Sequence, residues 1–231
     1  MTSTTPDSTT AASRNTVFTL FFVLAAIVAM SHLANDWVKL ADPGGLVWKA
    51  AGIVLLGLYA LSQRSWIAGA GLLFCALGDV LLEIVFVYGM AAFAIGHIFY
   101  IAAFAEWGRV LGLNKRDFPV VIIVLLISAA LLVWLLPGMG DLTIPALGYQ
   151  AIITVMVCSA FVVKAPMLAR LGAVIFMLSD TLIAAGKFAD ADIPPGSVWI
   201  TYAGAQIMIA WGMSRIAPFR DRAKRQAASA A

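Results

Sequence analysis

Long apolar segments with almost no charge recur from Val17 to Ile216, and they constrain the fold more than any other feature of the chain. Of the 231 residues, 62% are hydrophobic and 12% are charged, which leaves too few charges to coat a water-soluble domain. In lipid every backbone polar group needs a partner within the protein, so the segments must form helices or a closed barrel. They are continuously apolar rather than alternating, which predicts helices. We therefore expect an all-α, polytopic transmembrane bundle.

The apolar segments divide into about eight predicted membrane helices, each near the roughly 20 residues that cross a bilayer. Asp117 and Pro119 are typical of a helix start, as a cap followed by a first-turn proline. The predicted spans are residues 17–34, 46–61, 66–87, 89–107, 118–136, 142–163, 167–187 and 197–216. Residues 1–16 are predicted to be a disordered tail, residues 17–217 the transmembrane domain and residues 218–231 a basic tail.

Basic residues are distributed unevenly between the two sides that eight spans define. Eight spans place both termini on one side, and that side holds 12 of the 15 lysines and arginines. The positive-inside rule therefore predicts that both termini are cytoplasmic. We expect a multi-pass protein of the plasma membrane. The 12 residues are Arg14, Arg64, Arg109, Lys115, Arg116, Lys164, Arg170, Arg215, Arg220, Arg222, Lys224 and Arg225.

Other classes of function find little support in the composition. The net charge of +3 does not indicate nucleic-acid binding, because the basic residues fall in loops that fix membrane orientation. Cys75 and Cys158 lie inside apolar segments without a CxxC pattern, so we expect no disulfide or redox centre. With two distant histidines, the chain lacks the usual ligand set of a catalytic zinc. We expect no metal or other cofactor, and the sequence does not determine the oligomeric state.

A few ionisable and polar residues interrupt the predicted membrane helices. A charged side chain at mid-membrane costs at least about 2.5–3.5 kcal/mol, so it needs a partner or a function. Asp79 and Asp180 lie near the middle of their helices, and Glu83 follows Asp79 by one turn. From their positions we expect them to converge on a polar cavity nearer the non-cytoplasmic face. The other candidates for this cavity are Lys49, His97, Tyr149, Tyr202 and Gln206.

Plainer roles remain open for most of these residues, because polar side chains in membrane helices also serve packing and anchoring. The alternatives are structural hydrogen bonds for Asp79 and Asp180, water contact for Glu83, packing for His97, snorkelling to the interface for Lys49, and interfacial positions for Tyr149 and Tyr202.

Two of the predicted helices share a short pattern around their aspartates. Gly78-Asp79-Val80-Leu81-Leu82 and Ser179-Asp180-Thr181-Leu182-Ile183 each have a small residue, Asp and then an x-Leu-aliphatic run. The two helices run in the same direction, which would fit a parallel repeat of four helices. Apolar helices also produce such matches by chance.

Two buried carboxyls suit two kinds of chemistry. One of a neighbouring pair can hold its proton while the other is ionised, so the pair can act as general acid and general base. That division of labour suits hydrolysis through an oxocarbenium-like state. The same groups can instead carry protons through a transporter, and the residues alone do not separate these functions.

Four ordered motifs resemble the YhhN lysoplasmalogenase family. They are Gly78-Asp79-Val80-Leu81-Leu82-Glu83, Phe93-x-x-Gly96-His97-x-x-Tyr100-x-x-x-Phe104, Phe176-x-x-Ser179-Asp180-x-Leu182-Ile183-Ala184 and Thr201-Tyr202-x-x-Ala205-Gln206. Each motif is weak alone, but the ordered set covers most of the chain beyond its tails. One departure occurs at Lys49, which is followed by Ala50 where the family typically has Lys-Pro.

The resemblance implies an eight-helix membrane hydrolase with Asp79 and Asp180 as its catalytic residues. It implies cleavage of the vinyl ether bond of lysoplasmalogens, releasing a fatty aldehyde and a glycerophospho-base, with the lysophospholipid drawn from the bilayer. Glu83, His97, Lys49, Tyr149, Tyr202 and Gln206 are then expected to support the carboxyls or bind the substrate. The alternatives are a proton-coupled transporter or lipid-binding protein, and a related hydrolase acting on another lyso- or ether lipid.

Overall fold

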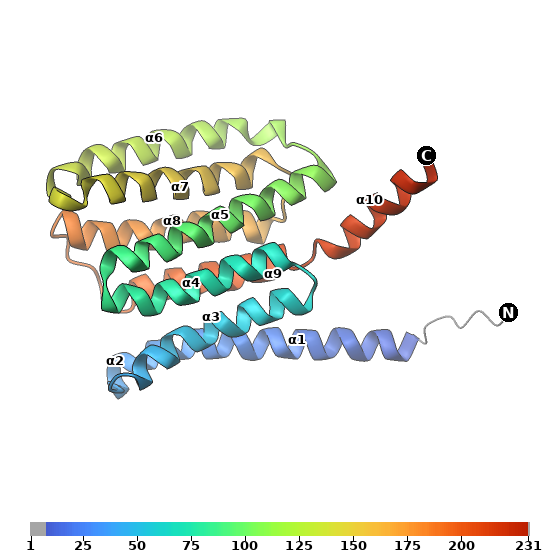
Figure 1. The fold of residues 1–231 in the computed structure, drawn as a ribbon, viewed down its shortest axis with the longest axis horizontal. Coiled ribbons are helices and arrows are strands. Elements are labelled where there is room, and N and C mark those ends of the chain that lie inside the picture. Colours follow the sequence, from blue (N-terminus) through green and yellow to red (C-terminus); the bar gives the residue numbers. More distant parts are fainter. Residues whose placement is uncertain (1–7, 231) are drawn as a thin grey trace.

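The computed structural model describes residues 8–230, and these form a bundle of long antiparallel helices (Figure 1). The all-α prediction is confirmed. The bundle comprises α1 (Ser8–Ser31), α3 (Gly44–Ser62), α4 (Trp66–Ile84), α5 (Phe86–Leu111), α6 (Phe118–Leu135), α7 (Thr143–Val162), α8 (Met167–Phe188) and α9 (Ser197–Met213). Two further helices are α2 (Asn35–Val38) and α10 (Ala217–Ala230).

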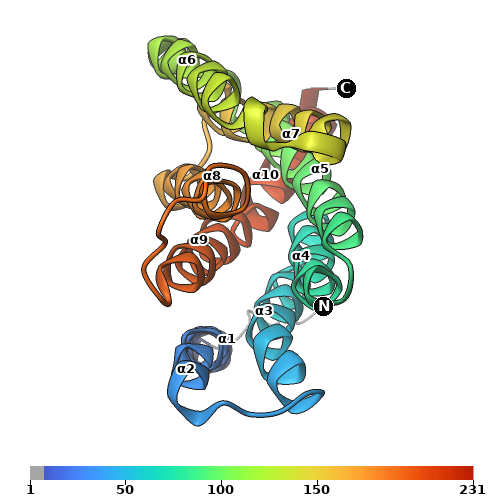
Figure 2. The same ribbon diagram turned by 90° about the vertical axis from the view of Figure 1, so that its left-hand side faces the viewer.

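The long helices are arranged in two rows when the bundle is viewed from one end (Figure 2). One row holds α3, α4, α5 and α7, and the other holds α1, α9 and α8, with α6 packed beside α7. The helices α3 and α4 contact α9 across the rows, and α7 contacts α8. Residues from α4, at the centre of one row, therefore face residues from α8 and α9 in the other.

The expected membrane helices are present, with differences at their ends. Seven helical segments in the described part of the chain are long and apolar enough to cross a membrane. The eighth, α9, has 17 residues and packs along α8 inside the bundle. Helix α1 begins at Ser8, so residues 8–16 are helical where a disordered tail was predicted; residues 1–7 lie outside the described residues.

The start of α6 shows how a capping signal can serve another purpose. Pro119 occupies the first turn as predicted. Asp117 precedes the helix, but its side chain makes no capping hydrogen bond. Its Oδ2 atom instead accepts hydrogen bonds from Asn114, at 2.7 Å, and from Arg170 of α8. The aspartate therefore connects the start of α6 to the start of α8.

Small residues allow the helices of the first row to approach closely. A Cβ atom at Gly71 would lie 2.6 Å from the Tyr100 ring, and one at Gly96 would lie 2.7 Å from Cys75 Sγ. The backbone of each glycine therefore packs directly against a side chain of the other helix, and small residues permit such close contacts between membrane helices. This packing holds the aspartate-bearing helix α4 against α5.

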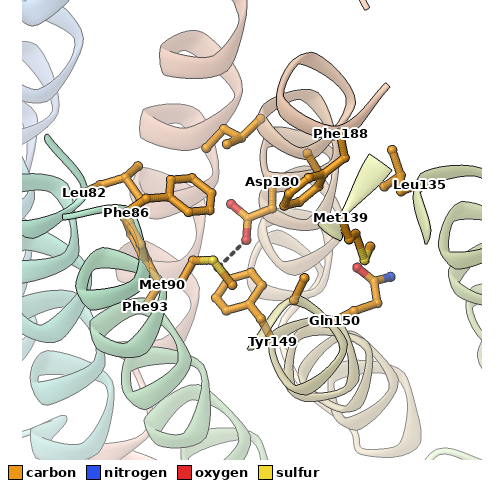
Figure 3. Close-up of a pocket in the computed structure, with 13 residues that line it drawn as sticks. Leu82, Phe86, Met90, Phe93, Leu135, Met139, Tyr149, Gln150, Asp180 and Phe188 are labelled. Atoms are coloured by element: carbon orange, nitrogen blue, oxygen red, sulfur yellow. Dashed lines mark hydrogen bonds between the residues drawn. The ribbon is translucent and has the colours of Figure 1, made fainter. Parts of the chain in front are cut away.

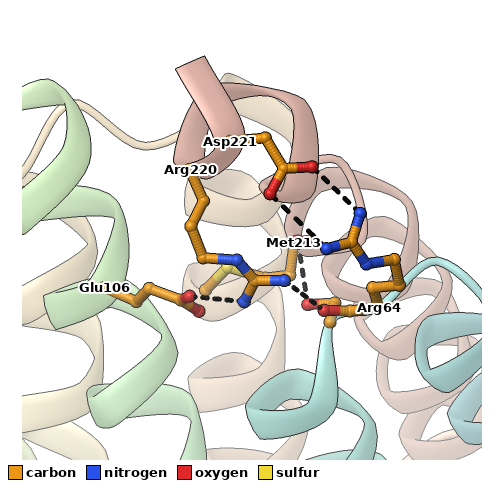
Figure 4. Close-up of polar contacts among 6 residues, drawn as sticks. Arg64, Glu106, Met213, Arg220 and Asp221 are labelled. Carbon is orange, nitrogen blue, oxygen red and sulfur yellow. Dashed lines mark hydrogen bonds and ion pairs between the residues drawn. The ribbon is translucent and has the colours of Figure 1, made fainter. Parts of the chain in front are cut away.

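Helix α10 and the start of α1 lie at the same end of the bundle, and ion pairs attach α10 to that end (Figures 1 and 4). Arg220 donates to Glu106 of α5 at 2.9 Å and to the Arg64 carbonyl at 3.0 Å. Arg64 in turn contacts Asp221 at 2.9 Å. The start of α1 and helix α10 lie at one end, which agrees with an even number of crossings between them. That this end faces the cytoplasm stays a prediction.

Candidate active site

A polar cavity of about 310 Å³ lies between the two rows, near the end of the bundle opposite α10. We call it the polar chamber. Its polar and charged lining comes from five different helical segments: His32, Lys49, Asp79, Glu83, Ser179, Asp180 and Tyr202. Leu82, Phe93, Ile183, Val198 and Trp199 are among its apolar walls. The structure thus brings both predicted aspartates to one cavity.

Asp79 lies in the wall of the chamber, five residues before the end of α4. At a helical rise of 1.5 Å per residue, that places it about 8 Å from the helix end. The residue is 3% exposed, and its Oδ2 atom accepts a 2.7 Å hydrogen bond from the Tyr202 hydroxyl of α9. The bond fixes the carboxyl across the gap between the rows and partly offsets the cost of its burial.

Asp180 has the same kind of partner but different surroundings. Its Oδ2 atom accepts a 2.5 Å hydrogen bond from the Tyr149 hydroxyl of α7. Figure 3 shows this carboxyl directed into a second cavity of about 60 Å³, which we call the apolar pocket. Asp180 lines both cavities, as do Leu82, Phe93 and Ile183. The carboxyl therefore stands at the junction of a polar and an apolar space.

The apolar pocket is built almost wholly from carbon and sulfur. Its side chains come from α4 to α8 and from the short turns between α6 and α7. Besides Asp180, its polar lining residues are Tyr149 and Gln150, and the Gln150 amide donates to Ser128 at 2.9 Å. The remaining walls include Phe86, Met90, Leu135, Met139, Ala146, Ala184 and Phe188.

An ion pair lines the polar chamber. Lys49 Nζ of α3 lies 2.5 Å from Glu83 Oε1 of α4. The lysine side chain is 17% exposed, whereas that of Glu83, in the last turn of α4, is 52% exposed. Lys49 does not extend alone towards an interface, because it binds a carboxylate in the chamber wall.

His97 and Gln206 do not line either cavity. His97 is fully buried, and its ring packs against Phe176 and Tyr149 at centroid distances of 4.6 and 5.5 Å. Neither of its ring nitrogens has a hydrogen-bond partner among the described residues. Gln206 Oε1 accepts a 2.6 Å hydrogen bond from the Tyr100 hydroxyl. Both residues lie in the core beside the site, where His97 supports Tyr149.

The described side chains contain no group of three or more His, Cys, Asp or Glu residues placed to hold a metal ion. What the two cavities offer is a pair of carboxyls, each oriented by a tyrosine hydroxyl. Such a pair can donate one proton and accept another within a single bound molecule. The cavities also suit an amphiphile, because one is lined by charges and the other by apolar side chains.

The lining residues that the sequence did not single out are mainly apolar. Met90, Leu135, Met139 and Phe188 resemble ordinary lipid-facing or core residues in the sequence, and no local pattern marks them as a pocket. Phe93, which lines both cavities, does fall within one of the four motifs.

Comparison with known proteins gives consistent matches. The sequence profile of the YhhN family matches residues 44–213. A protein named lysoplasmalogenase from Mycobacterium bovis is 35% identical over 181 residues, which cover 71% of this chain and 68% of the relative. A lysoplasmalogenase from Mycobacterium tuberculosis matches with the same identity and coverage. No solved structure matches the chain significantly.

Proposed function

Because the chain belongs to the YhhN family, we propose that this multi-pass membrane hydrolase cleaves the vinyl ether bond of lysoplasmalogens. The substrates are alkenyl-glycerophosphocholine and alkenyl-glycerophosphoethanolamine, and the products are a fatty aldehyde and the glycerophospho-base. The proposed setting is the plasma membrane, with the termini and α10 in the cytoplasm and the polar chamber towards the opposite face.

The observation that carries this proposal is the junction of the two cavities at Asp180. A lysoplasmalogen has a charged headgroup, a short glycerol segment and one long apolar chain, with the vinyl ether where the chain begins. The polar chamber suits the headgroup and glycerol, and the apolar pocket suits the first carbons of the chain. In this orientation the vinyl ether lies beside Asp180, with Asp79 on the polar side.

The reaction needs one acid and one base and returns both to their starting states. A carboxyl donates its proton to the β-carbon of the vinyl ether, and the electrons of the double bond form the new C–H bond, leaving an oxocarbenium ion. The second carboxyl, ionised, removes a proton from water as the water oxygen bonds to the α-carbon. The resulting hemiacetal gives its hydroxyl proton to the first carboxylate. The glycerol oxygen takes a proton from the second carboxyl as the C–O bond breaks.

We assign the acid role to Asp180 and the base role to Asp79. The proton must reach a carbon of the apolar chain, and Asp180 lines the apolar pocket as well as the chamber. The water must come from the polar side, and Asp79 lines the chamber with its carboxyl fixed by Tyr202. The two tyrosines hold the carboxyls in place, as preorganised catalytic groups require.

The test gives the purified protein a lysoplasmalogen and measures the fatty aldehyde released. The wild type is expected to release aldehyde from the alkenyl lipid but not from its saturated alkyl analogue, which has no double bond to protonate. The double variant Asp79→Asn/Asp180→Asn is expected to lose at least about 10³-fold in rate, because both proton transfers are removed.

Asp192→Asn serves as the matched control, because Asp192 is exposed in the loop between α8 and α9 and lines neither cavity. This variant should keep wild-type activity. Wild-type activity in the double variant would rule out the carboxyl mechanism. A wild type that releases no aldehyde from any alkenyl lipid would rule out the proposed reaction.

A further inference from the structure

The Lys49–Glu83 ion pair has no part in the proton transfers, yet it occupies the polar chamber in which the headgroup is placed. Lys49 is the only lysine or arginine among the chamber-lining residues that the structure describes. The three acidic lining residues are Asp79, Glu83 and Asp180, and His32 also faces the cavity, with its ring against Trp199. The chamber is therefore rich in carboxyls, with one strong cation.

We propose that this ion pair is the binding site for a zwitterionic headgroup, with Lys49 binding the phosphate and Glu83 binding the ammonium group. This inference rests on the function proposed above, and it assigns the chemistry that selects the substrate. A phosphocholine or phosphoethanolamine carries one negative and one positive group two carbons apart. The pair presents one charge of each sign at adjacent positions.

Electrostatic balance favours a zwitterion over an anion in this cavity. When Lys49 turns towards a phosphate, the half-exposed Glu83 loses its neighbouring cation in a cavity that also contains Asp79 and Asp180, and another cation can then take the place of the lysine. The ammonium of a zwitterionic headgroup supplies that cation. An anionic headgroup such as phosphoglycerol would leave Glu83 unpaired and add negative charge beside Asp79 and Asp180. Specificity then arises from repulsion of the wrong headgroup as well as attraction of the right one.

The order of residues along the cavity matches the order of groups in the lipid. Glu83 is the more exposed member of the pair and lies in the last turn of α4, and Asp79 lies one turn deeper in the same helix. Leu82, beside Glu83 in sequence, lines both cavities, as does Asp180. Headgroup, glycerol, vinyl ether and chain can therefore follow one path from Glu83 to the apolar pocket.

Binding can be measured without turnover, and the chamber contains its own reporter. Trp199 lines the chamber, so its fluorescence is expected to change when a headgroup enters. The probes are 1-alkyl-lysophosphocholine and 1-alkyl-lysophosphoglycerol, which lack the vinyl double bond and are not cleaved. The full-length protein in an uncharged detergent should bind the phosphocholine lipid about 10-fold more tightly than the phosphoglycerol lipid, as the loss of one charge-assisted contact predicts.

Variants of the pair should change this preference in distinct ways. Glu83→Gln should reduce the 10-fold preference to about twofold, and Glu83→Lys should reverse it. Lys49→Gln should weaken binding of both lipids about 10-fold, because both carry a phosphate. The exchanged pair Lys49→Glu/Glu83→Lys retains opposite charges, so it should unfold at the wild-type temperature while losing affinity for phosphocholine. This separates a loss of recognition from a loss of folding.

Lys39→Gln and Asp192→Asn are matched controls, since each removes one exposed charge outside the chamber and should leave both affinities unchanged. Equal binding of the two lipids by the wild type, or an unchanged preference in Glu83→Gln, would overturn the headgroup site. Aldehyde release measured in parallel distinguishes this failure from failure of the reaction. If the protein cleaves alkenyl lipids without headgroup preference, the proposed reaction stands and the headgroup site is wrong. If it binds phosphocholine lipids selectively without cleaving alkenyl lipids, the headgroup site stands and the proposed reaction is wrong.

Discussion

Asp79 and Asp180 lie in similar local sequences on α4 and α8, and each accepts a hydrogen bond from a tyrosine of another helix. Their surroundings differ. Asp79 is almost fully buried and lines only the polar chamber, whereas Asp180 is partly buried and lines the apolar pocket as well. Neighbouring space, more than local sequence, therefore decides that one carboxyl adjoins an apolar pocket while the other adjoins only the polar chamber.

The largest expected effect comes from removing each carboxyl alone. Asp180→Asn should lower kcat for a lysoplasmalogen about 10³-fold, because protonation of carbon is the difficult step and Asp180 is the only carboxyl among the described residues that line the apolar pocket. Asp79→Asn should lower kcat about 10²-fold, since water can still attack an oxocarbenium ion without full activation. Single-turnover aldehyde release measures both. A larger loss in Asp79→Asn would reverse the two assignments.

The second effect concerns the apolar pocket, which is lined by Asp180 but not by Asp79. Ala184→Phe places a ring in a space of about 60 Å³ and should raise KM for a long-chain lysoplasmalogen about 30-fold, because the first chain carbons can no longer enter. A substrate with a very short alkenyl chain should be less affected. KM values for the two substrates, measured with wild type and variant, make the comparison. An equal loss for both chain lengths would contradict this use of the pocket.

Removing the tyrosine hydroxyls should have a smaller effect, about 10-fold on kcat. Tyr149→Phe and Tyr202→Phe each delete one hydrogen bond to a carboxyl, at 2.5 and 2.7 Å respectively, while keeping the ring. The loss should appear in kcat and leave KM within about twofold, because the tyrosines position the reacting groups and do not bind the headgroup. Thermal unfolding of the same samples provides the control. An increase in KM with unchanged kcat would assign them to substrate binding.

The smallest effect concerns the residue that precedes each aspartate, which is Gly78 in one motif and Ser179 in the other. Gly78→Ser gives both aspartates a preceding serine, but a Cβ atom at residue 78 would lie 2.8 Å from the Phe93 ring. Displacing Phe93 should lower the free energy of unfolding by about 1–3 kcal/mol and activity about fivefold, since this ring lines both cavities. Chemical denaturation and aldehyde release measure the two effects.

Ser179→Ala is the matching change in the other motif. It removes the 3.0 Å hydrogen bond to the Val198 carbonyl and should cost about 1 kcal/mol of stability, with little change in rate. Equal effects of the two substitutions on activity would contradict the importance assigned to the Phe93 ring, which lines both cavities.

Much of the fold could be predicted because hydropathy reports directly on the solvent that surrounds a helix. The same logic identified Asp79 and Asp180, since charged residues inside apolar helices are conspicuous. The start of α1 was missed because Ser, Thr and Ala near the terminus are equally typical of a disordered tail. The end of α5 was placed four residues early, at 107, because Gly108 and Arg109 interrupt the apolar run while the helix continues to Leu111.

The pairing within the site could not be predicted, because it depends on which helices are neighbours. Tyr149 and Tyr202 were candidates, but nothing in the sequence assigns the first to Asp180 and the second to Asp79. The residues that line the apolar pocket could not be predicted for a related reason. Hydrophobic residues such as Met90 and Leu135 occur equally at positions that face lipid, the core or a cavity, and only the packing of the helices distinguishes the three environments.

The shared wall formed by Leu82, Phe93 and Ile183 has a consequence for the products as well as the substrate. In the proposed binding mode, cleavage at the junction leaves the aldehyde in the apolar pocket and the water-soluble glycerophospho-base in the polar chamber. Each fragment then leaves into a different phase, and their recombination would require both to return together. In that binding mode, three apolar side chains that line both cavities would help to keep the two products apart and so disfavour their recombination.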